Sequence, residues 1–237
     1  MQLRRRAGNT RKSISVRAPD LRVERALLRT GVAVLGCADE VGRGALSGPV
    51  CVGVVLVTAQ TPPAPRGVRD SKLLSPTRRT DMLPAIHAWT PHAIGMASAS
   101  EIDQLGIMAA MRLAGHRAIG SLPIAPDCVL LDGNVDYLTE PGRPPQTDSA
   151  TGPILPRVVT RVQADLRCAG VAAASILAKT ARDQVMVALA RDFPMYGWEQ
   201  NKGYAAPAHL AALRRWGPSP HHRVTWRLPT PAGEPGE

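Results

Sequence analysis

Apolar residues along this chain gather in short runs that are separated by glycine- and proline-rich turns. Residues 32–37 and 50–57 are almost wholly apolar, a pattern that predicts two buried strands joined by glycine turns. Residues 93–99 and 128–131 predict further strands, and residues 157–162 alternate between apolar and polar positions as a strand does.

Helices are indicated by longer periodic or alanine-rich segments and by capping residues at their starts. The expected helices cover residues 20–31, 75–89, 100–119, 168–191 and 207–216. Asp20 and Ser75 are the expected caps of the first two. Ser100 with Asp103 resembles a capping box, and Gly106 predicts a break in the helix that follows.

Strands and helices interleave, which predicts one α/β layer fold with helices at the C-terminal end. A length of 237 residues suits one sizeable core. We expect a disordered basic arm at residues 1–19, a single folded domain at 20–227 and a disordered tail at 228–237. Residues 139–156, rich in Pro, Gly and Thr, predict a long loop.

The composition sets limits on the core and the partner. Aromatic residues make up only 3% of the chain, so the core must consist mainly of Val, Leu, Ile and Ala. The formal charge of +10 favours a polyanionic partner. Basic residues are concentrated in residues 1–29 and 201–227, and the second of these segments contains no acidic residue.

The four cysteines are far apart and show no CxxC spacing, which argues against a zinc site and a disulfide framework. Most lie in apolar stretches and are expected to be small core residues in a reducing compartment. No apolar run approaches the 18 residues of a membrane span, and the basic N-terminus lacks the apolar core of a signal peptide. We therefore expect a cytoplasmic protein with no membrane association.

Four carboxylates follow predicted strands: Asp39, Glu40, Asp132 and Asp165. In open α/β sheets, ligands gather at the carboxyl ends of strands, and oxygen ligands without His or Cys favour Mg²⁺ or Mn²⁺. Acids of this kind in a basic protein are the pattern of two-metal phosphoryl chemistry. Taken singly, each acid also fits a simpler role, as part of a solvated turn, an Asx turn or a surface loop.

Lysine is rare, with only four in the chain against 25 arginines. Lys72, Lys179 and Lys202 nevertheless fall in the motif-like runs DSK, SILAK and NKGY. A compact ammonium differs from a guanidinium near crowded phosphates, so these lysines are candidates for backbone contacts. Chance placement is the alternative.

Several runs of residues, taken in order, resemble ribonuclease HII, the type 2 ribonuclease H. The runs are GCADEVGRG (36–44) with SGP (47–49), DSKLLS (70–75), LDG (131–133), AAASILAKTARD (172–183), KGY (202–204) and GPSPHHR (217–223). Each is weak alone, but the ordered set is highly specific and spans about residues 32–226.

The resemblance implies a ribonuclease-H-like α/β fold, with a five-stranded mixed sheet, flanking helices and a small C-terminal helical part. It implies that residues 20–227 form a catalytic domain in which the four acids bind Mg²⁺ or Mn²⁺. The implied activity is hydrolysis of the RNA strand of RNA–DNA hybrids, and cleavage 5′ of single ribonucleotides embedded in duplex DNA. The implied partners are these nucleic acids, and we expect a monomer.

The resemblance also implies how the substrate is bound. Gly42, Arg43 and Gly44 correspond to the turn that contacts the 2′-hydroxyl at an RNA–DNA junction, and Tyr204 to the tyrosine that stacks under the neighbouring deoxyribose. The positions expected near the nucleic-acid backbone are Ser71, Lys72, Ser175, Lys179 and Lys202.

The chain departs from the family pattern around the tyrosine, where Asn201 replaces a histidine, and Ala205 and Ala206 replace a glycine and a hydroxyl residue. These departures bear on a phosphate contact and on the conformation of the loop. The Gly42–Gly44 turn favours type 2 over the sister type, ribonuclease HIII.

Two other functions are compatible with parts of the sequence. A catalytically impaired nucleic-acid-binding protein of the same fold is the first alternative, but all four acids are intact. A resolvase- or transposase-like two-metal nuclease is the second, and the ribose-contacting turn argues against it. Neither Ser71 nor Ser175 shows a partnered base that would make it a nucleophile. His221-His222-Arg223 suits packing or phosphate contact better than a metal.

Overall fold

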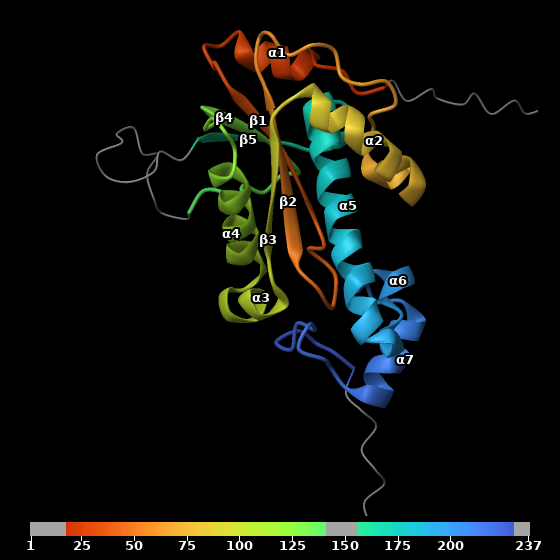
Figure 1. The fold of residues 1–237 in the computed structure, drawn as a ribbon. Coiled ribbons are helices and arrows are strands. Elements are labelled where there is room, and N and C mark those ends of the chain that lie inside the picture. Colours follow the sequence, from red (N-terminus) through yellow and green to blue (C-terminus); the bar gives the residue numbers. More distant parts are fainter. Residues whose placement is uncertain (1–17, 141–155, 230–237) are drawn as a thin grey trace, which may run out of the picture.

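The computed structural model describes residues 18–140 and 156–229. A five-stranded mixed sheet with the order β3-β2-β1-β4-β5 lies at its centre (Figure 1). The strands are β1 (Leu35–Val41), β2 (Val50–Val57), β3 (His92–Ala97), β4 (Cys128–Asp132) and β5 (Arg157–Arg161). β1–β2 and β2–β3 pair antiparallel, whereas β1–β4 and β4–β5 pair parallel. The expected α/β fold with a five-stranded mixed sheet is therefore confirmed.

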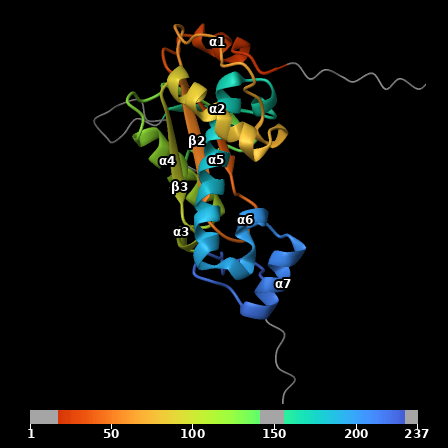
Figure 2. The ribbon, with the colours of Figure 1, turned by 45° about the vertical axis from the view of Figure 1, so that its right-hand side comes forward.

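Helices cover both faces of the sheet. They are α1 (Arg22–Leu28), α2 (Pro76–Trp89), α3 (Ala99–Leu105), α4 (Ile107–Gly120), α5 (Ala169–Asp192), α6 (Trp198–Asn201) and α7 (Pro207–Trp216). Short 3₁₀ turns occupy Ser71–Leu73, Ala164–Leu166 and Pro194–Tyr196. α5 and α2 lie on one face and α4 on the other, while α6 and α7 form a small unit around the end of α5 (Figures 1 and 2).

Side-chain alternation along β1 separates two hydrophobic cores. Leu35 and Cys37 belong to the core under α5, and Ala38 belongs to the core under α4. α5 approaches the sheet closely at Gly170, where a Cβ would lie 2.6 Å from the Cys37 Sγ. The small residues of α5 thus set how near the helix, and any polar group on it, comes to β1.

Three sequence predictions are corrected by the structure. The first strand begins three residues later than expected and runs to Val41, because β2 pairs with it as far as Val41↔Cys51. The capping box is formed by Ser98 and Glu101 instead of Ser100 and Asp103. The Asp103 carboxylate instead accepts hydrogen bonds from a segment distant in sequence, near residue 224.

The first helix is also capped differently from the prediction. Its N-cap is Leu21, and the Asp20 carboxylate accepts a hydrogen bond from the Arg22 backbone N–H at 3.0 Å. The predicted break at Gly106 is confirmed, since its φ of 77° separates α3 from α4.

The four cysteines are buried and unpaired core residues, as predicted. None of the helices in the described residues is long and apolar enough to span a membrane. Most of the predicted arm, tail and 139–156 loop lies outside the described residues. Leu228, the first residue of the predicted disordered tail, is described and packs against the hydrophobic cluster of the C-terminal helices, so the folded part extends at least to this residue.

Candidate active site

The parallel pairing of β1 and β4 brings Asp39 and Asp132 together. The paired register runs as far as Ala38↔Leu131, so the next residues along the two strands are Asp39 and Asp132. Both continue the alternation that directs side chains toward α5, and Glu40 points to the opposite face. Sheet register therefore places two carboxylates side by side, one near the end of β1 and one at the end of β4.

Asp165 joins this pair from the 3₁₀ turn after β5. The Asp132 Oδ1 atom accepts a hydrogen bond from the Ala164 backbone N–H at 2.7 Å and a longer one from the Asp165 N–H at 3.4 Å. These bonds hold the turn against the end of β4. Asp165 is 4% exposed, and its Oδ2 atom lies 3.7 Å from the ammonium of Lys72.

The negative charges of the acids raise one another's pKa, so the acids form one electrostatic group. The pKa of Asp39 is raised to about 8, first by burial and then by the charges of Glu40, Asp132 and Asp165, against a hydrogen bond with Ser175 that lowers it. Burial, followed by Asp132, raises the pKa of Asp165 to about 6. The pKa of Glu40 is raised as well, first by burial. A cationic ligand among these groups would relieve their repulsion.

The donor set fits hard divalent cations, because every candidate ligand is a carboxylate oxygen. In the part of the chain that the structure describes, no three His, Cys, Asp or Glu side chains already form a ready-made coordination shell. The acids repel one another, which contributes to the raised pKa values of Asp39 and Asp165. The cations that offset this repulsion, Arg43 and Lys72, are both exposed, with the Lys72 side chain 77% exposed.

Ser71, Lys72 and Ser175 surround the acids on the α5 side. The hydroxyls of Ser71 and Ser175 are hydrogen-bonded at 2.9 Å, and both residues are buried. The turn that carries Ser71 and Lys72 is stabilised by Asp70, whose carboxylate accepts from the Lys72 backbone N–H at 2.9 Å. The structure thus brings three predicted substrate-contacting residues next to the predicted metal ligands.

The Gly42–Gly44 turn follows β1 directly and is held from behind by a buried arginine. Arg223 donates from Nη1 to the Arg43 carbonyl at 2.8 Å, and from Nη2 to the Gly42 carbonyl at 2.6 Å. Arg223 is 0% exposed. The predicted packing role of the His221-His222-Arg223 run therefore holds for His222 and Arg223, which are buried, and Arg223 holds the Gly42–Gly44 turn in place.

A second buried arginine joins the segment that follows this turn, residues 46–49, to the tyrosine loop. Arg182 on α5 donates to the backbone carbonyls of Pro49, Ser47 and Lys202 at 2.8, 3.0 and 2.9 Å. The Gly203 carbonyl accepts a hydrogen bond from the Leu46 N–H at 2.8 Å. The turn and the loop are therefore bound into one unit although about 160 residues separate them in the sequence.

Tyr204 lies beside α5, with cations near its ring. The Arg182 Cζ atom is 5.3 Å from the ring centroid and the Lys179 Nζ atom is 5.8 Å away. Ser175, Lys179 and Arg182 are spaced four and three residues apart, so they share one face of α5. This face runs from the acids to the tyrosine.

Asn201 supports the tyrosine loop despite its departure from the family pattern. Its Nδ2 atom donates to the Tyr196 carbonyl at 2.7 Å, and its Oδ1 atom accepts from the Gly203 N–H at 2.8 Å. Ala205 and Ala206 contribute no side-chain hydrogen bond to the loop. Asn201 therefore stabilises a tight loop in which Lys202 adopts a left-handed φ of 51°.

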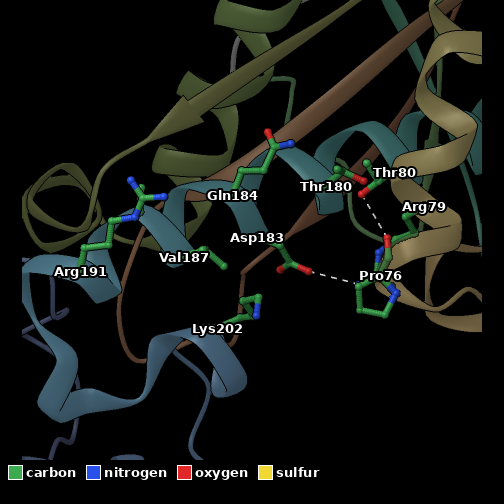
Figure 3. A pocket seen from close by; sticks show the side chains of 10 residues that line it. Pro76, Arg79, Thr80, Thr180, Asp183, Gln184, Val187, Arg191 and Lys202 are labelled. Carbon is green, nitrogen blue, oxygen red and sulfur yellow. Dashed lines mark hydrogen bonds and ion pairs between the residues drawn. The ribbon is translucent and has the colours of Figure 1, made fainter.

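Lys179 and Lys202 are less free than the sequence suggested. The Lys179 ammonium forms an ion pair with Asp183 at 2.7 Å, and Asp183 also pairs with Arg79 at 3.3 Å. The Lys202 ammonium donates to the Glu199 carbonyl. Lys202 also lines a pocket of about 420 Å³ between α2 and α5, with Arg79 and Asp183 (Figure 3). None of the four acids lines this pocket, so it is separate from the candidate chemistry.

The backbone contacts by which Arg182 and Arg223 support the site were not predicted from the sequence. Arg182 and Arg223 lie inside the family-like runs, which is the only signal that pointed to them. Their partners are backbone carbonyls, and no residue type in a sequence identifies such a partner.

The chain is similar in sequence to known proteins over most of its length. The Ribonuclease HII family model matches residues 35–228. The chain is 44% identical over 210 residues to a ribonuclease HII of Streptomyces coelicolor, covering 88% of this chain and 83% of that protein. It is 44% identical to a ribonuclease HII of Porphyromonas gingivalis, covering 84% and 92%.

Solved structures show the same fold. Ribonuclease H2 from Pyrococcus horikoshii OT3 has a TM-score of 0.64 at 24% identity, over 82% of this chain and 94% of that one. Ribonuclease HII from Archaeoglobus fulgidus, solved in complex with PCNA, has a TM-score of 0.61 at 26% identity, over 81% and 93%. A ribonuclease HIII solved with Mn²⁺, Bst-RNase HIII, has a TM-score of 0.59 at 20% identity, over 82% and 67%.

Proposed function

We propose that this chain, which belongs to the ribonuclease HII family and is a ribonuclease H, cleaves on the 5′ side of single ribonucleotides embedded in duplex DNA. It would also hydrolyse the RNA strand of longer RNA–DNA hybrids. The products are a 3′-hydroxyl and a 5′-phosphate. The observation that carries this proposal is that hydrogen bonds from Arg182 and to the Gly203 carbonyl join the Tyr204 loop to residues 46–47, which directly follow the Gly42–Gly44 turn.

Asp39, Glu40, Asp132 and Asp165 are the residues that would hold two divalent cations, Mg²⁺ or Mn²⁺. Bound there, such ions supply a nucleophile at neutral pH and stabilise charge on the attacking and leaving oxygens. The protein's part is to keep the acids together by β1–β4 register and by the Asp132 bond to the Ala164 N–H. Ser175 holds the Asp39 carboxylate from α5.

The Gly42–Gly44 turn comes almost directly after Asp39 and Glu40 in the chain, so a ribose bound at the turn would be next to the scissile phosphate. Gly44 has open space around it, with no atom within 4 Å of an added Cβ. A sugar can therefore approach the backbone closely, and the backbone groups can recognise a 2′-hydroxyl, the feature that separates RNA from DNA.

Tyr204 supplies the second half of the discrimination. Its flat ring offers a surface on which a deoxyribose can rest and which a 2′-hydroxyl would crowd. The turn then selects a ribose and the ring selects the deoxyribose beside it. Lys72, Lys179 and Lys202, with the hydroxyls of Ser71 and Ser175, would contact the strand on either side.

The domain organisation belongs to the same proposal. Residues 20–227 would form the catalytic domain, and the basic residues 1–19 would add electrostatic affinity for the duplex. The tail at 228–237 would take no part in the chemistry. We propose that a single chain is sufficient, because the acids, turn and tyrosine all come from one copy.

The test uses a duplex with one ribonucleotide, its all-deoxy twin and a uniform RNA–DNA hybrid. We expect cleavage of the first and third and none of the second. Tyr204→Ala should lower kcat/KM on the single ribonucleotide more than on the hybrid, because only the first presents a deoxyribose beside the ribose. Equal losses on both substrates would show that the tyrosine does not recognise the junction.

A further inference from the structure

A chain of buried hydrogen bonds connects two histidines of the C-terminal helical part to the backbone of Tyr204. His209 on α7 and His222 are 0% and 1% exposed. Their Nε2 atoms lie 3.0 Å apart. At one end, the backbone N and the hydroxyl oxygen of Ser219 each lie 2.9 Å from the His222 Nδ1 atom, and at the other the His209 Nδ1 atom lies 2.8 Å from the Tyr204 carbonyl.

The two ends of this chain determine where the protons are. A backbone N–H can only donate, so the His222 Nδ1 atom must be an acceptor and its proton must be on Nε2. A carbonyl can only accept, so the His209 Nδ1 atom must carry a proton, which leaves its Nε2 atom bare. The His222 Nε2–H then donates to the His209 Nε2 atom, and the Trp198 Nε1–H, 3.2 Å away, donates to the same atom.

This arrangement requires that both rings stay neutral. Burial lowers the pKa of His222 to about 4, with the neighbouring His209 as the next cause, and burial also lowers the pKa of His209. A second proton on either ring would bring two N–H donors face to face. At neutral pH both histidines are therefore in the form that the hydrogen bonds need.

The geometry points to a new role: His222 and His209 are positioning residues that hold the Tyr204 carbonyl, and so set the place of the ring that recognises the RNA–DNA junction. This inference rests on the function proposed above for Tyr204. The Ala206 N–H also reaches this carbonyl, at 2.7 Å. The side chains of Ala205 and Ala206 cannot form hydrogen bonds, which leaves His209 as the side chain that ties the loop to α7.

The first experiment measures the tautomers in the full-length wild-type protein. Nitrogen-15 NMR distinguishes a protonated from a bare ring nitrogen, and the chain has only six histidines to assign. We expect the proton on Nδ1 in His209 and on Nε2 in His222 at pH 7. The opposite tautomer in either ring, or a doubly protonated ring, would overturn the relay.

The second experiment compares His209→Asn with His209→Leu. An asparagine amide nitrogen lies near the position of Nδ1 and can still donate to the Tyr204 carbonyl, whereas leucine cannot. Both variants remove the acceptor for Trp198, so they differ mainly in the bond to Tyr204. The readout is kcat/KM on the single-ribonucleotide duplex divided by kcat/KM on the hybrid.

We expect His209→Leu to lower this ratio roughly three- to tenfold, the worth of one hydrogen bond, and His209→Asn to keep it within about twofold of wild type. Adding His209→Leu to Tyr204→Ala should change the ratio no further, because the histidine acts through the tyrosine. Thermal unfolding of each variant separates this effect from general destabilisation.

The outcomes separate the two proposals. If Tyr204→Ala lowers the ratio while both His209 variants leave it unchanged, the positioning role is wrong and the junction-recognising role stands. If Tyr204→Ala leaves the ratio unchanged, the junction-recognising role is wrong. The NMR chemical shifts of the Tyr204 ring then test the positioning role. They should differ from wild type in His209→Leu and match wild type in His209→Asn.

Discussion

Gly42 and Gly44 look equivalent in the sequence, but the structure predicts different consequences when each is replaced by alanine: one variant should lose stability and the other should lose activity. Gly42 has a φ of +88°, and a Cβ added there would lie 2.1 Å from the Arg182 Nε atom and 2.8 Å from the Pro49 carbonyl oxygen. Gly44 has neither a positive φ nor an atom within 4 Å of the added Cβ. Gly42→Ala therefore tests the scaffold of the turn, and Gly44→Ala tests the surface that a ribose would approach.

The cost of Gly42→Ala can be estimated from its contacts. The left-handed backbone costs an L-residue about 1 kcal/mol. The guanidinium of Arg182 must also move, which weakens its three hydrogen bonds to the carbonyls of Pro49, Ser47 and Lys202, at about 1 kcal/mol each. The total is about 4 kcal/mol, a large part of the roughly 5–15 kcal/mol that keeps a domain folded.

Urea unfolding and cleavage assays separate the two effects. We expect Gly42→Ala to lose about 4 kcal/mol of unfolding free energy, and Gly44→Ala to stay within about 0.5 kcal/mol of wild type, as surface changes usually do. Gly44→Ala should still lose activity on both the single-ribonucleotide duplex and the hybrid, because its methyl group would meet the sugar. Equal stability of the two variants would refute the reasoning about Arg182, and full activity of Gly44→Ala would refute the close approach of the ribose.

Three further predictions concern the acids, the arm and a buried glutamate. Asp39→Asn should abolish nearly all cleavage in Mg²⁺ and retain duplex binding in a gel-shift assay, because it removes a charge that would hold the ions; near-normal turnover would contradict the metal assignment. Deleting residues 1–19, which contain six basic residues, should reduce the slope of log affinity against log salt by about one unit for each phosphate that the arm neutralises, and an unchanged slope would mean that the arm does not touch the duplex. Glu24 is 0% exposed, and burial raises its pKa from the ordinary 4.5 to about 7. The folded protein thus holds a proton on Glu24 that the unfolded chain releases. The contribution of this proton to the free energy of unfolding is present below pH 4.5 and is lost as the pH rises through 7. Glu24→Gln keeps the oxygen that accepts from the Gly170 N–H, so it should be more stable than wild type by about 1–3 kcal/mol at pH 8 and equal to it at pH 4, as measured by urea unfolding; no difference at pH 8 would contradict the raised pKa.

The sequence predicts those elements of the site whose conformation is determined by the chemistry of their own residues. The apolar run of β2 and the break at Gly106 were predicted because a buried strand and a left-handed glycine leave direct marks on composition. The end of β1 was not predicted, since Asp39 and Glu40 are polar and their strand conformation is imposed by pairing with β2. Tertiary pairing overrides local pattern at that point.

The candidate acids were predicted, but their arrangement depends on register. Nothing in the sequence places Asp39 beside Asp132, because that neighbourhood follows from the parallel pairing of Ala38 with Leu131. The capping box was displaced for a similar reason. Ser98 and Glu101 satisfy the same spacing rule as Ser100 and Asp103, and the strand before them ends at residue 97, which selects the earlier pair.

The carbonyl partners of the buried arginines were not predicted from the sequence, and the burial of these arginines changes how the charge of the protein is understood. A net charge of +10 suggests a surface for nucleic acid, yet Arg182 and Arg223 are fully buried and direct their donors at backbone carbonyls. Burial lowers the pKa of Arg223 to about 10, which leaves it charged at neutral pH. Part of the basicity is therefore structural, and only the exposed remainder can produce a salt-dependent affinity.

This division of charge bears on how the enzyme would distinguish substrates. Arg182 bonds both to Ser47, beyond the glycine turn, and to Lys202, before the tyrosine. A displacement of one element strains the bonds to the other, so buried, directional hydrogen bonds set the spacing between the Gly42–Gly44 turn, proposed to contact the ribose, and the Tyr204 ring, proposed to contact the deoxyribose. Salt screens exposed charges much more than buried ones. Raising the ionic strength should therefore weaken binding to every duplex while leaving the preference for a ribose–deoxyribose junction nearly constant. A preference that fell in parallel with affinity would instead place discrimination in the exposed lysines.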